Sequence, residues 1–161
     1  MAEVSLWGVV IGGLLGIGGT IGGSIATALR DKSQQEYEIK KKRAEKFEEL
    51  VAAVYEFDHW LSAVRDRRVF GQNTALETVS PFSKVQAISS VYFQQFSKLV
   101  RELEFAADQY QAWTYSAQNK RLDNKTAVEI NDGYEGAYRP YAEKREVLLD
   151  ALQKFARNHF Q

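Results

Sequence analysis

The chain of 161 residues contains no cysteine, which excludes disulfide bonds, thiolate catalysis and zinc sites built on cysteine. Histidine occurs only twice, at positions far apart in the chain, so the sequence predicts neither a metal site nor a cofactor. Only two prolines occur, Pro81 and Pro140, and alternation of apolar and polar residues is scarce. These absences disfavour β-strands and predict an all-α fold.

An excess of one charge is also missing, because 21 basic residues balance 21 acidic residues. No overall field therefore selects a nucleic acid, and we do not expect one as a partner. The glycine-rich N-terminal segment is not a phosphate-binding loop, since it lacks the Lys-Ser/Thr ending and does not follow a strand. No catalytic motif is found, and we do not expect an enzyme.

A long uncharged segment is the strongest feature that is present. Residues Val4 to Leu29 carry no charge and contain eight of the chain's eleven glycines. As a helix they would be roughly 39 Å long at about 1.5 Å per residue. That length exceeds a hydrocarbon core of about 30 Å, so the segment can span a membrane with tilt. The sequence predicts a transmembrane helix within residues 1–30 and a separate domain over residues 31–161.

On a helical wheel this segment has a small face and a bulky face. Glycines recur along the small face, and two more widen it: Gly8, Gly12, Gly16, Gly19 and Gly23, with Gly18 and Gly22 beside them. Such a face lets backbones approach closely in lipid, so we expect homo-oligomers, and its width suits contact with two neighbours in a ring. A line of hydroxyls at its edge would bond across helices or line a pore: Thr20, Ser24 and Thr27.

Two simpler interpretations of this segment stay open. Glycine is common in transmembrane helices, so the spacing can arise without specific association. A cleaved signal peptide is the other interpretation, because Ala26-Thr27-Ala28 resembles a cleavage site. Against it, the apolar run is long for such a peptide, and Glu3 but no Lys or Arg precedes the run.

The charges that flank the segment predict its orientation. Between Arg30 and Lys46 there are seven basic residues against four acidic ones, whereas Glu3 is the only charged side chain before the segment. The positive-inside rule then places the N-terminus outside and the C-terminal domain in the cytoplasm, at the inner membrane of a bacterium. Four consecutive basic residues would contact lipid headgroups or form a solvated helix face: Lys40, Lys41, Lys42 and Arg43.

Three helices are expected beyond the span, over about residues 32–68, 81–119 and 126–160. Apolar residues recur in each at steps of three and four, which gives each helix one inward face. With short connections they would form an up-down-up three-helix bundle.

Local signals predict where these helices begin and bend. Ser80 suits an N-cap with Pro81 at the first helical position. Thr126 and Glu129 have the spacing of a capping box. Three residues are then expected to break or kink the last region, so that its main helix runs from about residue 140: Gly133, Gly136 and Pro140.

One carboxylate falls on an apolar helix face. Asp58 lies between Val54 and Leu61 in the stripe of the first bundle helix, and a buried carboxylate needs a partner. The candidates are Arg65, two turns later, and Arg145 on the inward face of the last helix. Such a group is either a polar site inside the bundle or an ion pair that sets helix register, and we favour the ion pair.

Other residues that can carry chemistry have structural interpretations. His59 shares an outer helix face with Tyr55, which is typical of a surface residue. Helical nucleases of the HEPN type place an Arg four to six residues from a His, whereas Arg157 and His159 have one residue between them. A further cluster could stack nucleic-acid bases but is more typical of a core: Tyr134, Tyr138, Arg139 and Tyr141.

These features predict a single-pass membrane protein that homo-oligomerises through its glycine-rich helix and forms a pore or a ring-shaped assembly. The layout is similar to that of small membrane effectors of bacterial antiviral systems, including the pore-forming accessory protein of some RNA-targeting CRISPR loci. The similarity covers the layout alone, because no motif residues match. A membrane-anchored adaptor whose bundle binds a protein partner is the alternative, and Val91 and Phe105 are the apolar residues expected to be exposed for it. A lysis protein with its helical domain outside the inner membrane is a third hypothesis, which the basic flank disfavours.

Overall fold

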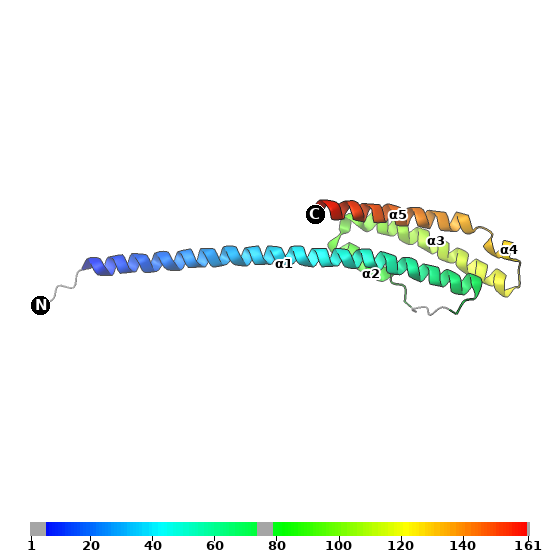
Figure 1. Cartoon of the computed structure of the whole chain (residues 1–161), viewed down its shortest axis with the longest axis horizontal. Coiled ribbons are helices and arrows are strands. Elements are labelled where there is room, and N and C mark those ends of the chain that lie inside the picture. The colour runs from blue at the N-terminus through cyan, green and yellow to red at the C-terminus, as the bar shows by residue number, and fades with distance from the viewer. Residues whose placement is uncertain (1–5, 74–78, 161) are drawn as a thin grey trace. The chain divides into compact units, whose positions relative to one another are not determined.

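A computed structural model describes the backbone of residues 6–73 and 79–160 and the side chains of residues 34–73 and 79–160. Every regular element in these ranges is helical, which confirms the all-α class. In chain order the elements are α1 (Leu6–Phe70), α2 (Phe82–Tyr92), the 3-10 turn η1 (Gln94–Phe96), α3 (Ser97–Leu122), α4 (Ala127–Asn131) and α5 (Tyr134–His159) (Figure 1).

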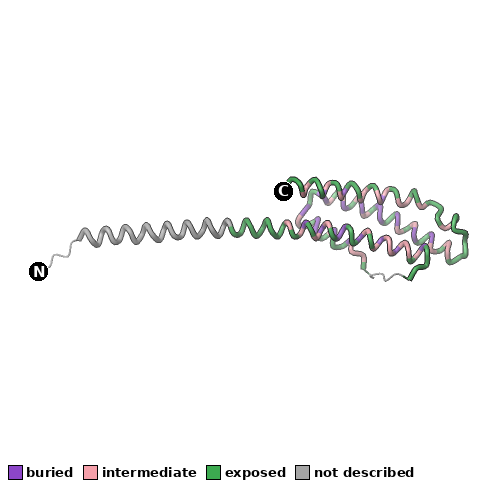
Figure 2. The backbone as a smooth tube through the Cα atoms, in the orientation of Figure 1, coloured by how far each residue is buried: buried purple, intermediate pink, exposed green. Residues whose placement is uncertain are grey.

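The chain divides into two compact units, residues 1–43 and 44–161. Within the first unit every side chain from Gln34 to Arg43 is exposed (Figure 2). The predicted span from Val4 to Leu29 lies outside the residues whose side chains are described. Among the side chains that are described, no helix is long and apolar enough to cross a membrane.

The second unit is a bundle of four packed helices, which corrects the expected three. The C-terminal part of α1 packs with α2, α3 and α5, and the single turn α4 links α3 to α5 (Figure 1). The core is built from the predicted apolar stripes: Leu50, Val54, Phe57 and Leu61 on α1, Val85 and Ile88 on α2, Leu103 and Tyr110 on α3, and Tyr141, Leu148 and Leu152 on α5. Buried positions therefore face inward on all four helices (Figure 2).

The fourth helix arises because the expected helix over residues 81–119 is a hairpin of α2 and α3. The chain leaves helical geometry at Phe93, where φ is −139° and ψ is 54°. This break buries the Phe93 ring completely, with its centroid 5.5 Å from that of Phe47 and 5.7 Å from that of Phe155. Apolar residues keep helical spacing across the break, because Tyr92 and Phe96 are four positions apart. The apolar periodicity of the sequence therefore does not reveal the break.

The helix ends follow local chemistry. The end of α1 has Gly71 at φ +70°, and the Gln72 N–H donates to the Asp66 carbonyl at 3.1 Å, which is a Schellman-type end. Helix α2 begins at Phe82, whose N–H donates to the Ser80 hydroxyl at 3.3 Å. The start of α2 thus lies one residue after the expected start at Pro81, within the usual variation of helix boundaries.

The region after α3 differs in part from expectation. The capping box of Thr126 and Glu129 is present at the start of α4, with both reciprocal hydrogen bonds. Gly133, at φ +78°, does break the chain between α4 and α5. Gly136 and Pro140, however, lie inside α5, which begins at Tyr134 rather than near residue 140. Helix α5 continues through Pro140 because the proline removes only one hydrogen bond, to a carbonyl at the exposed Gly136.

Candidate functional site

The glycine face and the hydroxyl line predicted for the membrane segment fall in residues whose side chains are not described. This applies to Gly8, Gly12, Gly16, Gly18, Gly19, Gly22 and Gly23, and to Thr20, Ser24 and Thr27. The backbone of α1 is helical from Leu6 onward, which is the conformation that their spacing requires. Their roles in helix packing stay predictions.

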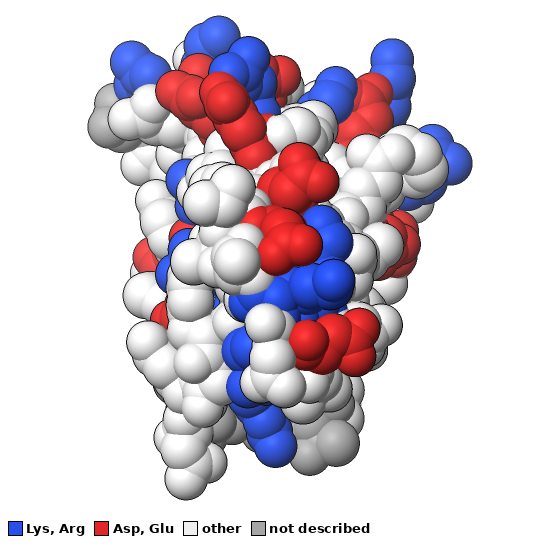
Figure 3. All heavy atoms as spheres, turned by 90° about the vertical axis from the view of Figure 1, so that its right-hand side faces the viewer, with Lys and Arg blue, Asp and Glu red and all other residues white. Residues whose placement is uncertain are grey.

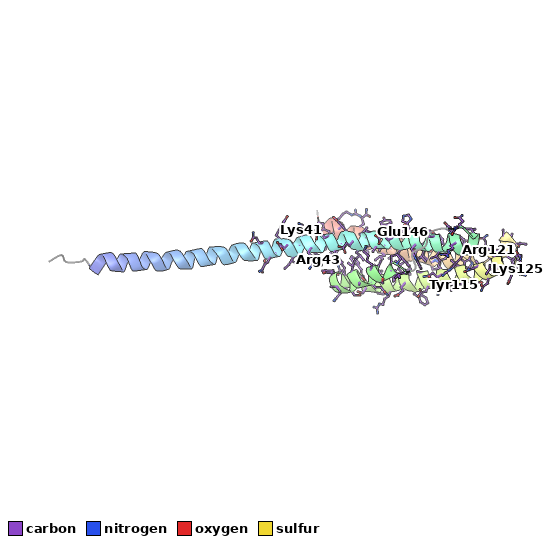
Figure 4. The ribbon with its side chains drawn as sticks, turned by 90° about the horizontal axis from the view of Figure 1, so that it is seen from below. Lys41, Arg43, Tyr115, Arg121, Lys125 and Glu146 are labelled. Atoms are coloured by element: carbon purple, nitrogen blue, oxygen red, sulfur yellow. The ribbon has the colours of Figure 1, made fainter. Side chains whose placement is uncertain are left out.

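The basic segment lies on the exposed part of α1. Lys40, Lys41, Lys42 and Arg43 are all exposed, and successive residues are turned by about 100° around the helix axis. Lys41 and Arg43 extend from α1 in Figure 4. The four charges therefore surround the helix rather than form one stripe, which suits a helix that meets headgroups on every side.

Asp58 and Arg145 lie together between α1 and α5. An Arg145 guanidinium nitrogen is 2.5 Å from Asp58 Oδ1, and the Tyr141 hydroxyl donates to the same oxygen at 2.8 Å. Arg65, the other candidate partner, instead forms an ion pair with Asp66 at 2.7 Å. The carboxylate thus has a cation and a hydroxyl donor from one helix.

The geometry around Asp58 suits a structural role. Burial, and then the negative charge of Asp58, raise the pKa of Tyr141 far above its usual range, so this phenol stays protonated and keeps donating. The Arg145 guanidinium and the Tyr141 hydroxyl are both bonded to Asp58 Oδ1, as expected for an ion pair between two helices. The cluster joins α1 to α5, and its role in setting helix register stays a prediction.

A second polar cluster lies where α1 ends, and no pattern in the sequence indicated it. Arg68 donates to the buried Thr114 hydroxyl at 3.0 Å, and its guanidinium carbon is 3.5 Å from the centroid of the Tyr115 ring. Arg121 donates to the Arg68 carbonyl at 3.0 Å and so caps α1. Burial lowers the pKa of Arg68. Tyr115 and Arg121 are labelled on α3 in Figure 4.

The predicted tyrosine cluster is closed by its own rings. Tyr134 and Tyr138 stack at 5.3 Å with their planes 9° apart, and Tyr110 stacks on Tyr141 at 5.9 Å. Arg139 is exposed and bonds to Glu135, one turn away. The rings therefore pack against one another, which is the arrangement expected of core residues.

The two histidines lie on different helices, His59 on α1 and His159 on α5. His59 is exposed on α1, and His159 stacks on Phe155 with ring centroids 4.0 Å apart. Within residues 34–73 and 79–160, no three His, Asp or Glu side chains gather closely enough to hold a metal ion.

An open groove runs between α3 and α5, which we call the α3–α5 groove. It has a volume of about 560 Å³, a floor that includes Phe105 and Pro140, and a charged rim made of Lys98, Arg101, Glu102 and Lys144. Phe105 is 65% exposed and Val91, on α2, is 68% exposed, as expected for the alternative function. Pattern alone marked these two residues as apolar but did not reveal that Phe105 lies in a groove.

One end of the bundle carries charges of both signs (Figure 3). Seen from the end where α3 meets α4, basic and acidic side chains lie beside one another with no field of one sign (Figure 3). Comparison with known proteins finds no matching family model, no matching curated protein and no matching solved structure.

Proposed function

We propose that this protein is a single-pass membrane protein whose glycine-rich helix assembles with copies of itself into a ring or pore. The bundle of residues 44–161 would then form a cytoplasmic collar around the assembly. The protein would act through permeation or gated assembly at the inner membrane, without covalent chemistry. An effector of the antiviral-defence type would work in this way.

The uncharged segment from Val4 to Leu29 is the observation that carries this proposal. Glycines at helical spacing remove side chains from one face, and close backbone approach between helices then gains dispersion contacts that lipid cannot match. The helical backbone of α1 from Leu6 is consistent with that use. The basic residues 40–43 would anchor the cytoplasmic end of the helix at anionic headgroups.

The bundle satisfies its own core and polar clusters, which leaves its outer surface available to an assembly. Its core is closed by its own four helices, so it can be carried by a separate anchor. The ion pair of Asp58 and Arg145 and the aromatic cluster are satisfied internally. The surface of the bundle and the N-terminal segment are therefore the parts that an assembly can use.

Substitution of the glycine face tests the assembly. We expect Gly12→Leu and Gly16→Leu each to abolish release of a small fluorescent dye from liposomes that contain the full chain, because a leucine separates the backbones. Leu14→Ile serves as the matched control, since its spacing puts it on the bulky side, and it should release dye as the unaltered chain does. Dye release that persists in both glycine variants would contradict the proposal.

A membrane-anchored adaptor is the second candidate function. The exposure of Val91 and Phe105 favours it, because large apolar side chains on a bundle surface are available to a partner. In this case the N-terminal helix is only an anchor. Alanine at both positions should remove a partner that co-purifies with the full chain, and unchanged recovery of that partner would count against the adaptor.

A further inference from the structure

The α3–α5 groove combines an apolar floor with a basic rim. Phe105 lies two residues after the buried Leu103, which is about 200° around the helix axis, so its ring faces away from the core and is 65% exposed. Pro140, on α5, lines the same floor as Phe105. The apolar residues that line the groove are Phe105, Ala106 and Pro140.

The rim carries more positive than negative charge, although the chain as a whole is neutral. Lys144 bonds to Glu102 at 2.7 Å, and Lys98 lies 3.9 Å from the same carboxylate. The Lys144 hydrogen bond lowers the pKa of Glu102, so this single acid is ionised and already engaged. Arg101 has no ion-pair partner in the part of the chain that the structure describes. Three basic side chains against one acidic side chain favour an anionic occupant.

One backbone carbonyl, a helical turn before Pro140, lacks its usual helical donor. Pro140 has no N–H, so it cannot donate to the Gly136 carbonyl one turn earlier in α5. Gly136 is exposed, and apart from its chain neighbours and the backbone of its own helix, no described atom lies within 4 Å of the point where its Cβ would be. A protein segment can supply N–H donors for such a carbonyl as well as acidic and apolar side chains. The alkyl chain and phosphate of an anionic lipid satisfy only the apolar and charged parts.

We propose that the α3–α5 groove binds an acidic segment of a partner protein, which inserts an aromatic or aliphatic side chain against Phe105 and Pro140. The carboxylates that flank this anchor pair with Arg101 and with the lysines of the rim. Helix α3 advances roughly 16 Å between Lys98 and Gln109, at about 1.5 Å per residue, so the groove accommodates about three turns of a helical segment. This inference deepens the second proposed function and is independent of assembly in the membrane.

Selection from a random peptide library tests the inference even though the partner is unidentified. The full chain, held in an uncharged detergent, is used to select from displayed 12-residue peptides. We expect enrichment of peptides in which Asp or Glu flanks one large apolar residue. A selected peptide should bind at least ten-fold more weakly to Phe105→Ser and to Arg101→Glu, and its binding should weaken as salt increases.

Matched variants separate the groove from the rest of the surface. Val128→Ser removes an apolar side chain that is 83% exposed, and Lys154→Glu reverses an exposed charge on α5 outside the groove. Both should bind the peptide as the unaltered chain does, and thermal melts should show that all four variants are folded. No enrichment of acidic peptides would overturn the inference, and so would peptide binding that Phe105→Ser and Arg101→Glu leave unchanged.

Two further experiments separate peptide binding in the groove from lipid binding and from assembly through the glycine-rich helix. Vesicles of 30% phosphatidylglycerol in phosphatidylcholine are offered to the soluble bundle of residues 44–161 as a lipid surface. Vesicle binding that depends on Phe105 and exceeds peptide binding would assign the groove to lipid and overturn the proposal. Gly12→Leu should leave peptide binding unchanged, so failure of the assembly would not be mistaken for failure of the groove.

Discussion

The two units of this chain differ in whether their helical side chains are buried. From Ala44 onward, buried residues recur along α1 at steps of three and four, and each faces another helix of the bundle. From Gln34 to Arg43 the same element exposes every side chain. The bundle segment is stabilised by tertiary packing, whereas the exposed segment has no apolar face to bury within the chain.

This difference shows where each unit must find its stability. The bundle helices bury their apolar faces against one another, so their stability comes from this packing. The N-terminal unit contains most of the glycines, which disfavour an isolated helix in water by about 1 kcal/mol each relative to alanine. We infer that its helix needs lipid or other copies of the chain. Substitutions in one unit should therefore leave the other unchanged.

The largest effect is expected in the bundle core. Leu103→Ala removes a side chain that is fully buried on α3 and leaves a cavity, so the free energy of unfolding should fall by about 2–5 kcal/mol. Urea unfolding followed by tryptophan fluorescence measures this change. Assembly in detergent should persist at low urea concentrations. Loss of assembly while the bundle is still folded would contradict the independence of the two units.

Loss of the Asp58 carboxylate should have the next effect. Asp58→Ala leaves the partly buried Arg145 and the Tyr141 hydroxyl without their acceptor, and we expect a loss of about 1–2 kcal/mol. Tyr141→Phe keeps the ion pair and should cost about 1 kcal/mol or less. A double-mutant cycle of the two changes should show coupling, and additive losses would contradict a shared cluster.

Alkaline pH should weaken the bundle through its buried phenols. Burial raises the pKa of Tyr110 from 10.0 to about 12, so the folded state favours the protonated phenol. The resulting stability is fully present below pH 10 and is lost as pH rises through about 12. Urea midpoints measured between pH 9 and pH 11.5 should fall less steeply for Tyr110→Phe. Equal slopes for the two proteins would contradict this assignment.

Alanine substitution at two glycines of the bundle should change its stability in opposite directions. Gly71→Ala puts a Cβ at φ +70° and 2.9 Å from an Arg121 nitrogen, so we expect a loss of about 1–2 kcal/mol. Gly136→Ala lies within α5 with open space around it and should gain about 0.5–1 kcal/mol. Thermal melts of both variants check the pair. Destabilisation by Gly136→Ala would mean that this position has a packing role.

The sequence predicted those features of the fold that depend on neighbouring residues alone. The Thr126 and Glu129 spacing located α4 because a capping box needs only neighbouring residues. The break at Phe93 was missed, since it depends on aromatic rings from distant helices and not on glycine or proline nearby. The choice of Arg145 over Arg65 for Asp58 likewise depends on how α1 and α5 pack. No local pattern contains that information.

The separation of the two units is tested most directly by the mass of the protein in solution. Light scattering would compare the detergent-purified full chain, corrected for bound detergent, with residues 31–161 alone. We expect a discrete oligomer for the full chain and a smaller species without the N-terminal segment. A full chain that is monomeric, or a truncated chain that keeps the same subunit number, would contradict assembly through the glycine-rich helix.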